Sequence, residues 1–173
     1  GALLLVLGWF GFNGGSVLGA SGGNSSLAGR VCAITAIGAA AGGLASFGIV
    51  FIQSRFINLE ALMNGMLAGA VSVTAGTNVL TPACAILTGV IGGFVYTGGS
   101  RFLLYLQVDD PLDASPIHGA CGVWGCLAVG LFGSEPSLAE GLFYGAPKQL
   151  AWQIIGTTII ITWAAGVMGV IFT

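Results

Sequence analysis

The chain has 173 residues, of which 55% are hydrophobic and 6% are charged, whereas soluble proteins carry about 25% charged residues. Four Lys or Arg and six Asp or Glu are too few to cover a globule of this size, so the composition excludes an ordinary soluble domain and indicates a lipid environment. Because the net charge is −2 and the basic residues are scattered, nucleic-acid binding is excluded as well.

Six apolar stretches approach the 20 or so residues that a helix needs to cross the hydrocarbon core. We predict an all-α membrane protein with six transmembrane helices, near Ala2–Leu18, Val31–Ile52, Leu62–Val79, Cys84–Leu106, Ile117–Phe132 and Leu150–Phe172. The connections are too short to hold a soluble domain, so residues 1–173 are expected to form one membrane-embedded unit. Basic residues flank both sides equally, and charge alone leaves the orientation open.

The first stretch contains the segment Gly8–Ser16, which mixes aromatic rings and polar atoms with glycine. Aromatic faces attract small cations, and Phe12 and Ser16 share one helix face because they are four residues apart. Trp9 could equally belong to the aromatic belt at the membrane surface. The segment therefore indicates either a cation-recruiting surface or an interfacial anchor.

Glycine is the second unusual feature, with 31 residues against the 12 or so expected from average usage. Many glycines are spaced four apart, which places two of them on the same face of a helix. Such pairs favour close approach of helix backbones in membranes. They predict a tightly packed bundle, and they occur at Gly11/Gly15, Gly15/Gly19, Gly38/Gly42, Gly65/Gly69 and Gly89/Gly93.

Isolated polar residues in the later stretches need partners. Asn64 and Thr74 are predicted to form hydrogen bonds between helices. The cysteines lack the spacing of a zinc site and are interpreted as small buried apolar residues. We therefore predict no metal site and no cofactor, and the residues concerned are Cys32, Cys84, Cys121 and Cys126.

Three aspartates, Asp109, Asp110 and Asp113, precede the fifth stretch. Carboxylates at this position cap the free N–H groups of a helix and complement its dipole. A role in gating or in docking a partner is the alternative, and the sequence does not choose between them.

His118 is the only histidine, and it lies just inside the fifth stretch. A neutral imidazole offers one hydrogen-bond donor and one acceptor, so it can bind a polar solute without adding charge. Gly122 and Gly125 follow on the same face of a regular helix and are expected to leave space above the ring. The alternative is a structural histidine near the membrane surface.

The segments Gly8–Ser16, Asn64–Gly69 and Asp109–His118, with Thr74–Gly76 and Pro82 between them, resemble the ammonium transporter family, which includes the methylammonium permeases and the Rhesus proteins. The resemblance implies an eleven-helix fold built from two inverted repeats, usually assembled as a homotrimer. This chain would supply helices six to eleven, without the N-terminal repeat and the C-terminal tail.

The resemblance also implies roles for individual residues. His118 corresponds to one of two facing pore histidines and a possible proton relay, and Phe12 to a ring that closes the outer mouth. Ser16 and Trp9 correspond to the substrate-recruiting site, and Leu67, Thr74 and Ala114 to the pore wall. The motif of Asp109, Asp110 and Asp113 would then be structural.

The function implied is transport of ammonium or ammonia, and of methylammonium, with deprotonation at the entrance. The expected partners are the lipid bilayer of the cell membrane, the missing N-terminal half, two further copies in a trimer and a PII-type regulatory protein at the cytoplasmic face. The alternative is a sensor that binds ammonium without conducting it. The sequence shows no Ser/His/Asp or zinc arrangement typical of an enzyme.

Overall fold

The computed structural model describes residues 1–19 and 21–172. Most of these residues are helical, and the connections between helices include one antiparallel pair of two-residue strands, β1 (Ser134–Glu135) and β2 (Ala139–Glu140). The all-α prediction is thus correct apart from this short hairpin. The helices are α1 (Ala2–Gly15), α2 (Asn24–Ser54), α3 (Leu59–Thr74), α4 (Pro82–Tyr105), the π-helical turn η1 (Ser115–Ala120), α5 (Cys121–Phe132), the 3-10 turn η2 (Leu142–Tyr144) and α6 (Pro147–Ile171).

Four helical segments within these ranges are long and apolar enough to cross a membrane: α2, α4, η1 continued by α5, and α6. The first and third predicted spans extend beyond the ends of the observed helices, because α1 ends at Gly15 rather than Leu18 and α3 ends at Thr74 rather than Val79. At 14 and 16 residues these two helices fall short of a full span. The number of membrane crossings therefore remains a prediction.

The helix starts also differ from the predicted boundaries. The second helix begins earlier than predicted, since α2 starts at Asn24 rather than Val31. Helix α3 begins at Leu59 because Asn58 caps it, accepting a hydrogen bond from the backbone N–H of Ala61 at 2.9 Å. Helix α4 begins where Thr81 accepts the N–H of Cys84 at 3.2 Å.

Helices α2, α3 and α4 pack through their glycines. A Cβ atom added to Gly42 would lie 2.6 Å from the Gly69 Cα atom, and one added to Gly93 would lie 2.8 Å from the Gly42 carbonyl oxygen. Only glycine allows backbones to approach this closely. The close packing predicted from the glycine pairs is confirmed on these three helices but not at Gly11 and Gly15, where an added Cβ would meet none of the described residues within 4 Å.

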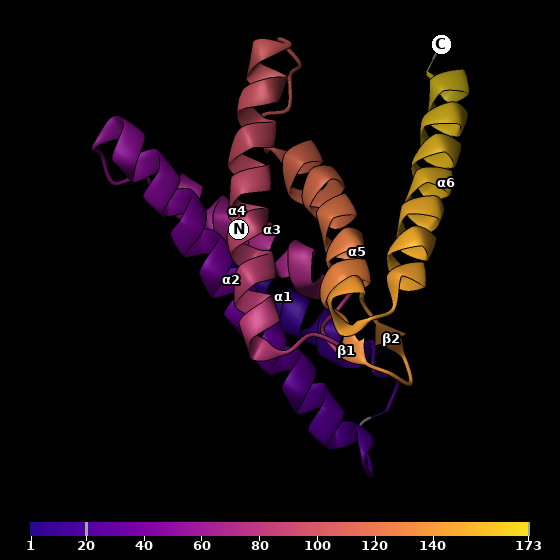
Figure 1. Cartoon of the computed structure of the whole chain (residues 1–173). Coiled ribbons are helices and arrows are strands. Elements are labelled where there is room, and N and C mark those ends of the chain that lie inside the picture. Colours follow the sequence, from indigo (N-terminus) through magenta and orange to yellow (C-terminus); the bar gives the residue numbers. More distant parts are fainter. Residues whose placement is uncertain (20, 173) are drawn as a thin grey trace.

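The two ends of the bundle carry different connections between helices. The α2–α3 and α4–η1 connections and the end of α6 lie in the upper part of Figure 1, spread from left to right, and the β1–β2 hairpin lies in the lower part, near the start of α2. At that lower end Arg30 pairs with Glu135 at 3.0 Å, and the Ser134 hydroxyl donates to the Val79 carbonyl oxygen at 2.7 Å. The hairpin is thereby fixed to α2 and to the α3–α4 connection.

Candidate functional site

Trp9 of α1 lies beside the only histidine, and Phe12 of the same helix contacts Trp9. The Trp9 indole is stacked on the His118 imidazole of η1, with ring centres 6.0 Å apart and planes inclined by 21°. Phe12, one turn further along α1, meets the edge of Trp9 at 6.0 Å and 67°. The structure thus brings His118 next to the aromatic segment of α1, which the sequence analysis considered separately.

Side-chain hydrogen bonds join α1 to α2 and α3. The Trp9 indole N–H donates to the Thr74 hydroxyl at 2.8 Å, which confirms that Thr74 bonds between helices. The Asn13 amide donates to the Thr35 hydroxyl at 3.0 Å and to Thr74 at 3.5 Å. Asn13 and Thr35 are buried members of this network that the sequence analysis did not select. The sequence did contain a signal for Asn13, because an asparagine within an apolar helix needs polar partners.

The surroundings of His118 differ in one respect from those expected. Gly125 does not leave space above the ring, because an added Cβ would lie 2.6 Å from the Ser72 carbonyl oxygen. The π-helical turn of η1 breaks the regular spacing, and Gly125 serves instead to bring α5 against α3. The His118 side chain is exposed, and within residues 1–19 and 21–172 neither imidazole nitrogen is hydrogen-bonded, so both remain open to a solute.

The residues proposed as pore wall lie in unlike environments. Leu67 is buried in an apolar cluster with Ile117 and Cys121, and Trp9 packs against this cluster. Ala114 is exposed, and its backbone N–H donates to Asp110 at 2.9 Å. Leu67 therefore belongs to the apolar cluster against which Trp9 packs, whereas Ala114 lies at the start of the segment that carries His118.

Asp110 and Asp113 have distinct local partners. Asp110 accepts hydrogen bonds from the backbone N–H groups of Ala114 at 2.9 Å and Ser115 at 2.7 Å. These bonds lower the pKa of its carboxyl group, and the bond from Ser115 has the largest effect. Asp113 accepts the Tyr96 hydroxyl at 2.9 Å. Both carboxylates therefore organise the chain before His118, and Asp109 is exposed.

Asn64 is hydrogen-bonded to the same Tyr96 hydroxyl that donates to Asp113. Its amide donates to the Tyr96 hydroxyl of α4 at 3.2 Å, which confirms the predicted bond between helices for Asn64. The chain Asn64–Tyr96–Asp113 thus links α3, α4 and the segment before η1.

Phe12 and Ser16 lie at the C-terminal end of α1. Ser16 follows the last residue of the helix, and its hydroxyl donates to the Phe12 carbonyl oxygen at 2.7 Å. Both side chains are exposed, and that of Phe12 to 61%. Since the hydroxyl proton is already committed, the Ser16 oxygen can act towards a ligand only as an acceptor, which suits a protonated amine.

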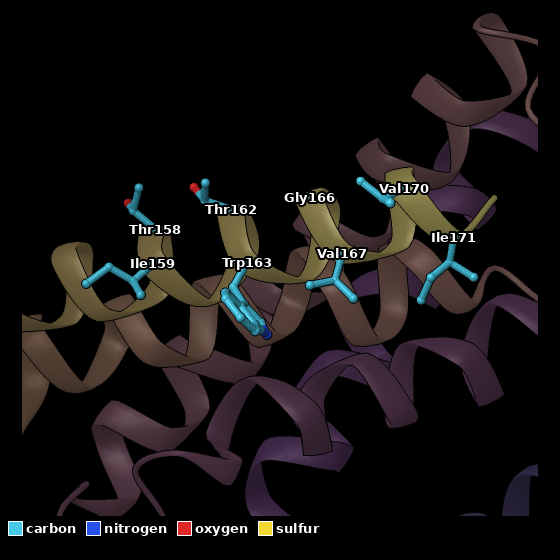
Figure 2. A pocket seen from close by; sticks show the side chains of 8 residues that line it. All are labelled: Thr158, Ile159, Thr162, Trp163, Gly166, Val167, Val170 and Ile171. Atoms are coloured by element: carbon cyan, nitrogen blue, oxygen red, sulfur yellow. The ribbon is translucent and has the colours of Figure 1, made fainter. Parts of the chain in front are cut away.

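An apolar hollow of about 710 Å³ lies far from these residues in sequence, along α6. Figure 2 shows that every side chain lining it comes from this one helix, with Ile159, Trp163, Val167 and Ile171 along one side. A face made by one helix without convergent polar groups is an unpartnered surface rather than a ligand site. Among the described residues there is also no group of three metal-ligating side chains.

Comparison with known proteins shows consistent similarity. The Ammonium Transporter Family model matches residues 1–173. A putative ammonium transporter of Synechocystis is 37% identical over 174 residues, which cover 100% of this chain and 31% of that protein. For a putative ammonium transporter of Arabidopsis thaliana the identity is 33%, over 99% of this chain and 38% of the relative. The chain thus spans between 31% and 38% of the length of these relatives.

Solved structures give the same result. Mep2 of Saccharomyces cerevisiae superposes with a TM-score of 0.88 at 27% identity, over 98% of this chain and 41% of that one. A structure described as a sensor Amt protein superposes with a TM-score of 0.85 at 32% identity, over 96% of this chain and 40% of that one. The chain therefore belongs to the ammonium transporter family, whose members are integral membrane proteins.

Proposed function

We propose that this chain is part of a transporter that moves ammonium or ammonia, and methylammonium, across the cell membrane. The observation that carries the proposal is the stack of Trp9 on His118, which leaves both imidazole nitrogens open. Moving a charge through an apolar passage is costly, whereas a neutral amine can exchange hydrogen bonds with a neutral imidazole. His118 is accordingly assigned as the pore residue that binds the solute and relays protons.

Recruitment is assigned to the end of α1 where Phe12 and Ser16 are exposed. The Ser16 oxygen accepts an N–H of ammonium, and the aromatic faces of Phe12 and Trp9 attract the cation. Neither contact is available to the ion inside the apolar passage beyond, so ammonium transfers a proton to water at this exposed end of α1 and continues as ammonia. Phe12 gates the passage, and Leu67, Thr74 and Ala114 belong to its wall.

The assembly is proposed to need more than this chain. His118 and Phe12 are both exposed, so the opposite side of the passage must come from elsewhere. We assign this chain to helices six to eleven of a two-repeat fold, as one membrane-embedded unit, with the first repeat facing it. The transporter would then be a homotrimer, with the α2–α3 and α4–η1 connections cytoplasmic and available to a PII-type regulator.

Liposomes that contain only this chain should show no saturable ammonium flux, because half of each proposed site is missing. Adding the remaining part of the transporter should restore it. Robust saturable flux through this chain alone would contradict the two-repeat assignment.

The role of His118 is tested in the transporter that contains this chain. His118→Ala should lower flux, since a polar solute loses a partner whose absence costs about 1 to 3 kcal/mol in a dry site. His118→Glu should let potassium compete, because a carboxylate favours a cation. Trp163→Phe on exposed α6 is the control. Unchanged preference for ammonium over potassium in both histidine variants, measured per folded molecule, would refute the pore assignment.

A sensor that binds ammonium without conducting it is the second candidate. It is favoured by the similarity to the structure described as a sensor Amt protein, at a TM-score of 0.85. Ammonium binding in the complete protein without any flux would select this function over transport.

A further inference from the structure

Thr74, the last residue of α3, bonds to two side chains of α1. Its hydroxyl oxygen accepts the Trp9 indole N–H at 2.8 Å and the Asn13 amide at 3.5 Å, and its proton is donated to the Ala70 carbonyl oxygen at 2.7 Å. A hydroxyl group has one donor and two acceptor positions. All three are therefore occupied, and Thr74 has no polar position left for a passing solute.

The bond from Trp9 determines where the indole ring lies. An indole side chain has a single polar group, its N–H, and here that group points to α3 rather than to the exposed side of α1. With the N–H held, the indole ring lies nearly parallel to the His118 imidazole, with ring centres 6.0 Å apart and planes inclined by 21°. The nitrogen atoms at the imidazole edge stay uncovered.

We propose that Thr74 is a positioning residue for the transport step, which it serves by holding the indole N–H of Trp9. This keeps the indole stacked on His118 and keeps a second hydrogen-bond donor away from the solute. The inference rests on the proposed function of His118. A released indole N–H would turn towards the passage and bind the lone pair of ammonia, which slows its release, and the ring would no longer fix the imidazole.

The variants Thr74→Val and Thr74→Ser separate the hydrogen bond from the shape of the side chain. Valine keeps the volume and removes the acceptor, whereas serine keeps the acceptor. Thr35→Val is the matched control, because Thr35 also accepts the Asn13 amide and donates to a carbonyl four residues earlier, but has no bond to Trp9. If Thr74→Val does not fold, Thr74→Cys takes its place as a weaker acceptor of similar shape.

Two measurements are made on the transporter that contains this chain. The first is the indole ¹⁵N–¹H NMR signal of Trp9, assigned by its loss in Trp9→Phe. The second is ammonium flux per folded molecule in proteoliposomes. In Thr74→Val we expect the Trp9 signal to shift, its N–H to exchange faster with solvent, and flux to fall about three- to tenfold, the change that one hydrogen bond of ordinary net strength carries. Thr74→Ser and Thr35→Val should retain the wild-type Trp9 signal and flux.

An unshifted Trp9 signal in Thr74→Val would overturn the inference, and so would a shifted signal with unchanged flux. Equal losses of flux in Thr74→Val and Thr35→Val would also overturn it, because the effect would then be general destabilisation. The proposed function fails separately, through absence of ammonium flux in the wild-type transporter.

Discussion

Helices α3 and α6 are both apolar, yet they occupy opposite environments. Nine of the 16 residues of α3 are buried, whereas none of the 25 residues of α6 is, although α6 is the most apolar of the four long helices. Figure 1 shows α6 leaning away from the bundle, while α3 lies inside it. Hydropathy therefore selects the helices that enter lipid and says little about which of them are covered by protein.

The difference lies in where the small residues meet a neighbour. Gly65 and Gly69 of α3 meet the backbone of α2, but Cβ atoms added to Gly156 and Gly166 of α6 would have no neighbour within 4 Å in the part of the chain that the structure describes. Lipid is as apolar as a leucine side chain, so apolarity alone does not drive helices together in a membrane. Close backbone approach supplies the contacts that do.

The largest effect should come from filling the contact between α2 and α3. Gly42→Leu places a side chain against the backbone of Gly65 and Gly69, each 2.6 Å from an added Cβ, and should cost about 3 kcal/mol or more. Gly166→Leu on α6 should leave stability unchanged. Thermal unfolding in detergent measures both, and equal losses would show that α6 is as tightly covered as α3.

A smaller effect is expected where α5 and α6 meet. A Cβ added to Gly130 would lie 2.7 Å from the Leu150 Cα, so Gly130→Leu should cost about 1 to 3 kcal/mol and move α6 away from α5. Spin labels on the exposed faces of the two helices report the separation, with Gly156→Leu as the control. An unchanged distance would mean that this contact does not hold α6.

The ion pair between Arg30 and Glu135 fixes the hairpin that precedes α6. The two side chains are 39% and 36% exposed, so breaking the pair with Arg30→Gln should cost at most about 1 kcal/mol, and less at high salt. The exchange Arg30→Glu with Glu135→Arg should recover part of the loss. The rate of hydrogen exchange at the hairpin amides measures this loss of stability. Unaltered exchange in Arg30→Gln would contradict the anchoring role of the ion pair.

The smallest effect concerns the hydrogen bonds that Asp110 accepts from the backbone N–H groups of Ala114 and Ser115 at the start of η1. The pKa of Asp110 is lower in the folded chain, so its stabilising contribution is complete above the ordinary aspartate pKa of about 3.9 and disappears as pH falls through the lowered value. Asp110→Ala should reduce the melting temperature slightly at neutral pH and flatten this acid dependence. Asp109→Ala is the control. If the melting temperatures of wild type and Asp110→Ala fall identically with decreasing pH, the hydrogen bonds of Asp110 are excluded as the cause of that fall.

By itself, the sequence determined the membrane class, the helical content, the glycine pairs that pack α2, α3 and α4, and the bonding roles of Asn64 and Thr74. These follow from composition and from spacings within one helix, which local geometry converts directly into a shared face. The roles assigned to His118, Phe12 and Ser16 came from motif resemblance and remain proposals.

The tertiary structure alone decided which side chains meet. The bond between Trp9 and Thr74 joins residues 65 positions apart, and the stack of Trp9 on His118 joins different helices, so no local spacing encodes either contact. Gly125 shows the same limit, because the π-helical turn at η1 shifted its face towards α3. Contacts between distant segments depend on how complete helices pack, and that arrangement is fixed by many small close approaches acting together.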